Sequence, residues 1–446
     1  MTPDPVAPDP AAPGPAAPGP VTPTPVPPDP GGQPTGTESP LLTRPSDGLP
    51  PVTQTAAALA QVVEAFAAGT GPVALDTERA GGYRYSQRAY LVQARRLGAG
   101  TALVDPVACP DLSDLAAVLA DAEWVLHAAG QDIPPLVEVG LVPASLFDTE
   151  LAGRLLGRDR VGLGALVESE LGVRLAKEHS AVDWSRRPIP EDWLAYAALD
   201  VELLLELREV LAAELREAGK AGWAAQEFAA LVEAPLPAPR HEPWRRTSGL
   251  HRVRGARRLA LVRALWEERD RQARERDITP SRLLPDAAIV EAALAGPVSA
   301  DDLASLPGFR GRGRRPRGRR ELAVWAQVLA QASRLPERDL PAAAPSYDGP
   351  PPARAWAERN PLAASRLAAA RAALVEIAAA HTLPVENLLT PDTLRRLLWE
   401  PPADVSVAAV GARLADLGAR RWQVGLVAET LTTVLEETVP SLVTGE

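Results

Sequence analysis

The chain has 446 residues, a formal net charge of −10 at neutral pH, and one cysteine, Cys109. This length exceeds a single compact domain and predicts two or three domains joined by linkers. One cysteine excludes an intrachain disulfide and fits a reducing compartment. No stretch approaches the roughly 20 apolar residues of a membrane span, so we expect a cytoplasmic protein without a membrane anchor.

Proline dominates residues 1–50, in repeats such as Ala-Pro-Gly-Pro and Pro-Asp-Pro. Such a composition cannot bury a core and predicts a disordered or polyproline II tail. The segment lacks the basic start and apolar centre of a signal peptide.

An apolar strand that ends in two acids follows the tail: Pro72-Val-Ala-Leu-Asp-Thr-Glu78. Side chains two positions apart on a strand share a face, so Asp76 and Glu78 point the same way. Two like charges at short range are unfavourable unless a cation lies between them, which makes a divalent metal the natural candidate. The alternative is that both acids are solvated or cap the next element.

Residues 73–77, 89–95 and 101–105 read as successive strands, followed by a helix at 112–120 and a buried strand starting at Trp124. Strands followed by alternating helix and strand predict an α/β domain with a mixed sheet flanked by helices. We place this domain at residues 51–234.

Two further acids lie at the ends of predicted elements. Asp132 follows the strand 124–129 at a strand-to-helix junction, where its alternative role is a helix cap. Asp148 precedes a helical run that begins near Leu151, and we interpret it as a cap or as a neighbour of the metal ligands.

Tyr196 and Asp200 lie four residues apart in the amphipathic helix predicted for residues 190–207. Positions i and i+4 share a helical face, so the phenol and the carboxylate can address one site. The alternative is a core tyrosine and a solvated aspartate. Four acids together supply the hard oxygen ligands of two Mg²⁺ or Mn²⁺ ions in a two-metal phosphodiester hydrolase.

Charge is unevenly distributed: residues 51–239 carry 15 basic and 27 acidic side chains, whereas residues 240–340 carry 22 basic and 13 acidic ones. A positive segment beside an acidic, metal-requiring domain suits a nucleic acid backbone. The alternative is a solvated basic loop. The steepest basic run lies in 308–320, and its candidate nucleic-acid-binding residues are Arg310, Arg312, Arg314, Arg315, Arg317, Arg319 and Arg320.

Helical patterns recur twice after the α/β domain, with Pro280-Ser-Arg-Leu-Leu-Pro-Asp286 echoed by Pro384-Val-Glu-Asn-Leu-Leu-Thr-Pro-Asp392. We expect one all-α domain at 240–335, a Pro-rich linker at 336–357, and a second helical domain at 358–440.

Several motifs resemble the ribonuclease D family, within the superfamily of 3′-5′ exonucleases named for its Asp-Glu-Asp-Asp acids. Asp76-Thr-Glu78 resembles the first exonuclease motif, His127-Ala-Ala-Gly-Gln-Asp132 the second, and Tyr196-Ala-Ala-Leu-Asp200 the third. The stretch Val182-Asp-Trp-Ser-Arg-Arg-Pro188 is also similar. Both helical domains resemble the helicase-and-ribonuclease-D C-terminal (HRDC) domain.

The resemblance implies a ribonuclease H-like nuclease fold with two Mg²⁺ or Mn²⁺ ions. It implies that Asp76, Glu78, Asp132 and Asp200 bind these metals while Tyr196 orients the attacking water. It also implies a protein that binds structured RNA and releases nucleoside 5′-monophosphates from 3′ ends, as in the maturation of transfer RNA precursors. We expect the protein to be a monomer.

Two other functions fit the same residues. A DNA-directed 3′-5′ exonuclease of this superfamily would use the same acids, and a non-catalytic nucleic-acid-binding protein could keep the fold. The complete set of acids and Tyr196 argue against the second. A helicase, which HRDC domains suggest, is excluded because the chain has no nucleotide-binding P-loop.

Overall fold

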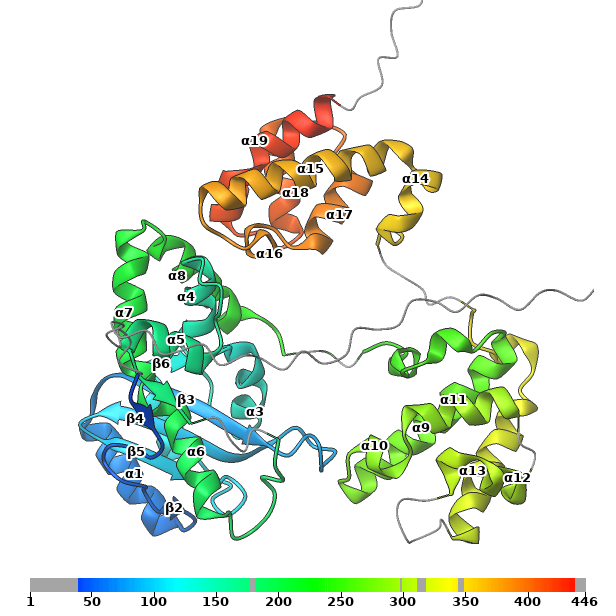
Figure 1. Ribbon diagram of the computed structural model, residues 1–446, viewed down its shortest axis with the longest axis horizontal. Helices are drawn as coiled ribbons and strands as arrows, with labels where there is room; N and C mark the ends of the chain where they lie inside the picture. Colours follow the sequence, from blue (N-terminus) through cyan, green and yellow to red (C-terminus); the bar gives the residue numbers. More distant parts are fainter. Residues whose placement is uncertain are drawn as a thin grey trace, which may run out of the picture. The chain divides into compact units, whose positions relative to one another are not determined.

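The structure is a computed structural model that describes residues 39–437 except 177–180, 237, 239, 297–298, 311–317 and 344–348 (Figure 1). Residues 1–38 of the expected Pro-rich tail lie outside the described residues. Residues 39–50 are described, and Leu41–Leu42 forms a strand that pairs with Arg174–Leu175. Part of the segment expected as tail thus pairs with the α/β domain, which composition does not reveal because this strand has only two residues and lies among prolines.

Among the described residues, the α/β domain has a mixed six-stranded sheet in the order β2-β5-β4-β3-β6-β7. β3 is antiparallel to β4 and parallel to β6, and β4 is antiparallel to β5. This confirms the predicted mixed sheet. The strands are β2 (Val52–Thr53), β3 (Thr70–Arg79), β4 (Ala89–Leu97), β5 (Gly100–Val104), β6 (Glu123–Leu126) and β7 (Ser145–Asp148), and the separate pair is β1 (Leu41–Leu42) with β8 (Arg174–Leu175).

Helices surround this sheet (Figure 1). They are α1 (Ala56–Ala68), α2 (Ser113–Leu119), α3 (Ile133–Glu138), α4 (Thr149–Leu155), α5 (Leu163–Leu171), α6 (Glu191–Glu202), α7 (Leu204–Glu217) and α8 (Ala221–Glu233), with a 3₁₀ turn η1 (Ala129–Gln131). The helix predicted for 190–207 is thus two helices, separated at Leu203, whose φ of −114° and ψ of 11° leave the helical region.

Strand alternation divides the core of the α/β domain into two layers. Val92 of β4 packs in the cluster that includes Phe66 of α1. Its neighbour Leu91 packs in the cluster that includes Ala197 and Ala198 of α6. The sheet therefore presents one face to α6, and Asp76 and Glu78 lie on this face.

The remainder of the described chain is helical, as expected. Leu265 and Trp325 lie in a shared hydrophobic core of this part of the chain. The first group of helices comprises α9 (Ala256–Arg276), α10 (Pro280–Leu283), α11 (Asp286–Ala295), α12 (Ala300–Ser305) and α13 (Arg319–Ser333), with 3₁₀ turns at Pro243–Arg246, Leu250–Arg252, Pro307–Phe309 and Glu337–Asp339.

A second group of helices follows, as expected for this part of the chain. It comprises α14 (Trp356–Arg359), α15 (Pro361–Ala380), α16 (Val385–Leu388), α17 (Pro391–Trp399), α18 (Val407–Asp416) and α19 (Arg421–Glu437), after a 3₁₀ turn at Ala353–Ala355. Across the residues that the structure describes, no helix has both the length and the apolar character to span a membrane.

Candidate active site

Asp76 and Glu78 lie on the face of β3 that is turned toward α6. In the antiparallel register with β4, Asp76 opposes Gln93 and Glu78 opposes Leu91. Opposed residues in antiparallel strands project from the same face, and Leu91 packs with Ala197 of α6. Strand periodicity and register together aim both carboxylates at this helix.

Helix α6 supplies Tyr196 and Asp200 from one of its faces, as their spacing predicts. Carboxylate oxygens of Asp76, Glu78 and Asp200 all lie within 4.8 Å of one another. The hydroxyl of Tyr196 hydrogen-bonds the carboxylate of Asp200. The fold thus brings four of the five predicted catalytic residues into one cluster.

Asp132 joins this group from the turn between η1 and α3. Its Oδ1 accepts a hydrogen bond from Thr77 Oγ1 at 2.6 Å, and its side chain is buried. Within the described residues it makes no side-chain capping bond to α3, so the alternative cap role is not supported. Burial is the largest cause of the raised pKa values of Asp76 and Glu78, and the charge of Asp132 raises both further, so Asp132 belongs to the same electrostatic site.

Asp148 has the capping role that the sequence predicts. Its Oδ1 accepts from the backbone N–H of Glu150 at 2.9 Å at the start of α4. The same carboxylate accepts from the N–H groups of Ala128 at 3.1 Å and Ala129 at 2.9 Å. Ala128 has a φ of 59°, a left-handed conformation that is costly for alanine. Asp148 therefore stabilises the turn that leads to Asp132.

Burial is the main cause of the raised pKa values in the acidic group. It raises the pKa of Asp132 to about 6 and that of Asp200 to about 7. The pKa values of Asp76 and Glu78 are also raised well above the ordinary range, first by burial and then by the neighbouring carboxylates. Burial lowers the pKa of His127 to about 4, so this histidine is neutral and adds no positive charge.

These four acids fit a divalent cation. Carboxylates that share a buried site repel one another, and a cation between them removes this penalty. Hard oxygen ligands of this kind suit Mg²⁺, Mn²⁺ or Ca²⁺. The residues present therefore match the metal that the sequence predicts.

We expect Mg²⁺ to raise the Tm of the protein more at about pH 7.5 than at about pH 5.5. Unfolded carboxyls titrate near pH ~4, below the folded-state pKa values of Asp132 and Asp200. Between these values the metal-free folded protein binds more protons than the unfolded chain, so its stability falls as the pH rises. At about pH 7.5 the carboxylate ligands are more fully deprotonated than at about pH 5.5, so they bind Mg²⁺ more tightly there.

The measurement is thermal unfolding in Mg²⁺ and in chelator at both pH values. An Asp200→Asn variant serves as the comparison, because its metal-free form should lose less stability as the pH rises. A Mg²⁺-induced change in Tm that is the same at both pH values would contradict this account.

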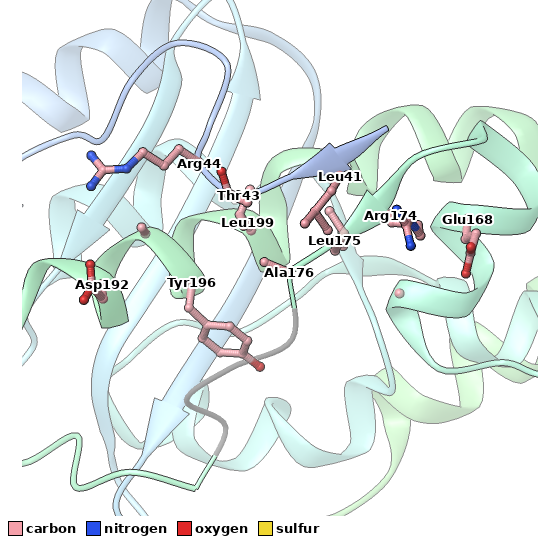
Figure 2. A pocket seen from close by; sticks show the side chains of 12 residues that line it. Leu41, Thr43, Arg44, Glu168, Arg174, Leu175, Ala176, Asp192, Tyr196 and Leu199 are labelled. Carbon is pink, nitrogen blue, oxygen red and sulfur yellow. The ribbon is translucent and has the colours of Figure 1, made fainter. Parts of the chain in front are cut away.

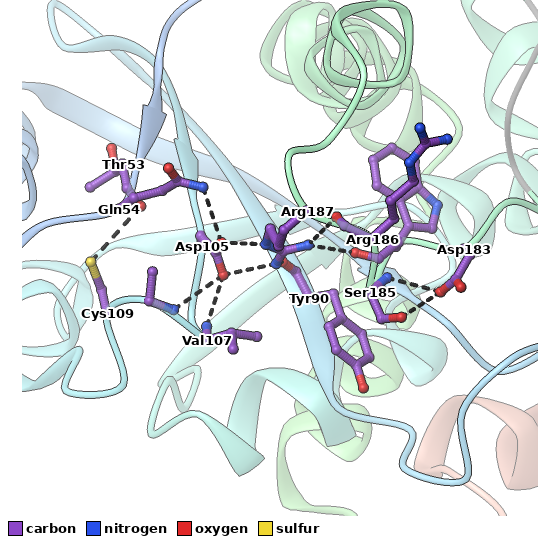
Figure 3. Close-up of polar contacts among 12 residues, drawn as sticks. Thr53, Gln54, Tyr90, Asp105, Val107, Cys109, Asp183, Ser185, Arg186 and Arg187 are labelled. Carbon is purple, nitrogen blue, oxygen red and sulfur yellow. Dashed lines mark hydrogen bonds and ion pairs between the residues drawn. The ribbon is translucent and has the colours of Figure 1, made fainter. Parts of the chain in front are cut away.

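A charged network fixes the segment that leads into α6 (Figure 3). Arg187 donates to both carboxylate oxygens of Asp105, at 2.7 and 2.9 Å. It also donates to the backbone oxygens of Trp184 and Tyr90, each at 2.8 Å. Burial acts to raise the pKa of Asp105, but the Arg187 guanidinium outweighs it and holds this pKa below the usual value. The stretch 182–188 is therefore tied to the sheet.

Two cavities border the acidic group. The Glu78 cavity, of about 350 Å³, is lined by Glu78, Gly82 and Val182 among others. The Tyr196 cavity, of about 590 Å³, is lined by Tyr196 and by residues of β1, β8, α5 and α6 (Figure 2). Open space therefore adjoins Glu78 in one cavity and Tyr196 in the other.

A mixed sheet with two acids on a central strand, facing a tyrosine and an acid on a helix, defines a site suited to metal-assisted hydrolysis of phosphodiesters. Family models agree: residues 51–216 match a 3′-5′ exonuclease domain and residues 258–325 an HRDC domain. Residues 349–435, where we expected a second HRDC-like domain, match a C-terminal domain of 3′ to 5′ exonucleases.

Known proteins identify the family more closely. The chain is 33% identical to a ribonuclease D of Gluconacetobacter diazotrophicus over 66% of this chain and 72% of that relative. A Bifidobacterium adolescentis protein of known structure is 39% identical, with a TM-score of 0.82 over 90% of this chain and all of that one. Escherichia coli RNase D, described as an exoribonuclease involved in structured RNA processing, is 27% identical, with a TM-score of 0.61 over 87% and 98% of the two chains.

The chain belongs to the ribonuclease D family. It is a divalent-metal-dependent 3′-5′ exoribonuclease, and RNA is its class of substrate. The fold predicted from its motifs is confirmed.

The predicted basic residues are only partly described. Arg310, Arg319 and Arg320 are exposed, and Arg310 donates to the backbone oxygen of Ser305 at 3.0 Å. The others, Arg312, Arg314, Arg315 and Arg317, lie outside the described residues.

Sequence reasoning missed two supporting residues. Thr77 donates a hydrogen bond to Asp132. Strand alternation places Thr77 on the other face of β3 from Asp76, so periodicity gave no reason to select it. Arg187 pairs with Asp105 across a long separation in sequence, and only its place in the family-like stretch 182–188 marked it.

Proposed function

We propose that the chain trims the 3′ ends of structured RNA, such as transfer RNA precursors, and acts as a monomer with two Mg²⁺ or Mn²⁺ ions. The observation that carries this proposal is the convergence of Asp76, Glu78 and Asp200 within 4.8 Å, with the charge of Asp132 acting on Asp76. Since transfer RNA precursors are processed in the cytoplasm of bacteria, the proposed substrate implies a cytoplasmic enzyme.

The four acids would hold the metals, each from an element that the fold positions separately. Asp76 and Glu78 come from β3, Asp200 from α6, and Asp132 is oriented by Thr77 Oγ1. When bound, divalent ions would supply the Lewis acidity that activates a water molecule and stabilises the leaving oxygen of a phosphodiester.

Tyr196 would position the water that attacks the scissile phosphate. Its hydroxyl already bonds Asp200, and burial together with nearby carboxylates raises its pKa further above the neutral range. The phenol therefore stays protonated and acts through hydrogen bonds rather than as a base.

The preference for structured RNA rests on the helical domains. We propose units at 51–234, 240–335 and 358–440 joined by a linker at 336–357, which the matches at 51–216, 258–325 and 349–435 support. The HRDC match falls within the basic part of the chain, whose arginines suit a phosphate backbone.

We expect the double variant Arg319→Ala/Arg320→Ala to bind RNA more weakly and with a shallower salt dependence. Each lost phosphate contact lowers the slope of log affinity against log salt by about 0.7 to 0.9. The control is Arg334→Ala, an exposed arginine at the far end of α13. Binding titrations at several salt concentrations test this, and an unchanged slope would remove both arginines from the RNA interface.

A time course on an RNA and a matching DNA, each labelled at the 5′ end, tests the proposed function. We expect Mg²⁺- or Mn²⁺-dependent shortening of the RNA from its 3′ end, and no shortening in chelator. A preference for DNA would favour the DNA-directed alternative. Binding without cleavage of structured or unstructured RNA would contradict the proposed chemistry.

A further inference from the structure

The Tyr196 cavity has one wall that is built by the segment just after the proline-rich region. β1 pairs in parallel with β8, with Leu41 opposite Arg174. Ser46 N donates to Glu202 of α6 at 2.9 Å, and Asp47 pairs with Arg95 of β4 at 3.2 Å. These contacts tie residues 39–47 to three elements of the α/β domain, so this wall is preformed.

The floor of the cavity is apolar and its ends are charged (Figure 2). Leu41, Leu175 and Ala176 lie between Arg44 at one end and Arg174 at the other. Apolar surface beside an aromatic ring can bind an unstacked nucleobase, and arginine side chains donate hydrogen bonds to phosphates. The carboxylates of Glu168 and Asp192, also in the lining, can accept hydrogen bonds from ribose hydroxyls.

Arg44 is available for such a contact. Its Nη1 pairs with Glu191 Oε1 at 3.0 Å, but the two side chains are 59% and 66% exposed. Exposed ion pairs contribute little to stability, so exchanging this carboxylate for a phosphate costs little. The Arg44 guanidinium can therefore turn to a bound strand without disturbing the fold.

We propose that the Tyr196 cavity holds the RNA strand immediately upstream of the scissile phosphate, with Arg44 as a phosphate contact; this rests on the proposed function. The terminal nucleotide carries only the scissile phosphate, which the acidic site itself handles. Only the upstream strand brings further phosphates, and two arginines beyond the acids match them. Tyr196, which lines the cavity and bonds Asp200, connects the two places.

The test compares two substrates that differ only in what lies upstream. The first is a short oligoadenylate RNA. The second is the p-nitrophenyl ester of uridine 5′-monophosphate, in which p-nitrophenol leaves in place of the upstream strand. The variants are Arg44→Ala and Leu41→Asp; Leu41 is 56% exposed, so both substitutions should leave the fold intact. The control is Arg216→Ala, an exposed arginine of α7 outside the cavity lining.

We expect both cavity variants to lower kcat/KM on the RNA by about tenfold, and Arg44→Ala to lower the salt slope by about 0.7, the loss of one single-strand phosphate contact. Their kcat/KM on the ester should equal that of the unaltered protein, as should both values for Arg216→Ala. Unchanged RNA kinetics in both variants, or an equal loss on RNA and ester, would overturn the proposal.

A binding measurement separates this proposal from the proposed function. RNA affinity is measured in an Asp76→Asn background, with and without Arg44→Ala. Weaker binding on loss of Arg44 would support the cavity as a strand site even if the unaltered protein hydrolysed neither substrate, an outcome that would reject the proposed function alone. Equal affinity would reject the cavity proposal alone.

Discussion

Asp76→Asn should lower the turnover of RNA by about a thousandfold or more, since loss of a metal ligand removes several kcal/mol of transition-state stabilisation. The same change should raise the Tm in chelator. Burial and then the charges of Asp132, Asp200 and Glu78 raise the pKa of Asp76, so ionisation of this carboxyl costs stability in the metal-free protein, and the neutral amide of Asn removes that cost. Turnover under saturating Mg²⁺ and thermal unfolding in chelator measure the two effects.

The opposite signs of these two effects separate a functional role from a structural one. A residue needed only for folding would lose activity and stability together. Asp121→Asn, an exposed carboxylate between α2 and β6, is the matched control and should change neither value. Full activity of Asp76→Asn would remove Asp76 from the set of metal ligands.

Tyr196→Phe should lower kcat by about a hundredfold while leaving the KM for RNA nearly unchanged, because a positioned hydrogen-bonding group contributes at least about this factor. The ring and its place in the cavity wall are kept, and only the hydroxyl that bonds Asp200 is lost. Single-turnover kinetics at saturating RNA measure the chemical step directly.

The increase in Tm on addition of Mg²⁺ provides the internal control for this variant. It should be retained, because the three carboxylates that converge within 4.8 Å are untouched. If Tyr196→Phe raised KM instead of lowering kcat, the phenol would serve substrate binding rather than the reaction.

Local periodicity explains why much of the site could be predicted from the sequence. Asp76 and Glu78 share a strand face at a spacing of two, and Tyr196 and Asp200 share a helical face at a spacing of four. These relations depend only on the type of element. The strong apolar pattern of β3 and the helical pattern of α6 made both elements predictable.

Long-range contacts explain what could not be predicted. Whether Asp132 caps α3 or joins the other acids depends on its hydrogen bond to Thr77, which lies on β3, far from Asp132 in the sequence. The pairing of Arg187 with Asp105 joins distant segments in the same way. The strand β1 has too few residues to show any periodicity, and its proline-rich surroundings predict disorder.

The anchoring of residues 39–47 has a consequence for any shortened form of this enzyme. The matched exonuclease domain begins at residue 51, which invites trimming of everything before it. Such a chain would lose Ser46, which donates a hydrogen bond to Glu202. Glu202 is only 2% exposed, and its carboxylate would then keep the ion pair with Arg95 but not the bond from Ser46. Removal of the proline repeats should therefore stop before residue 39, and the natural place to join a tag or a carrier protein lies upstream of that point.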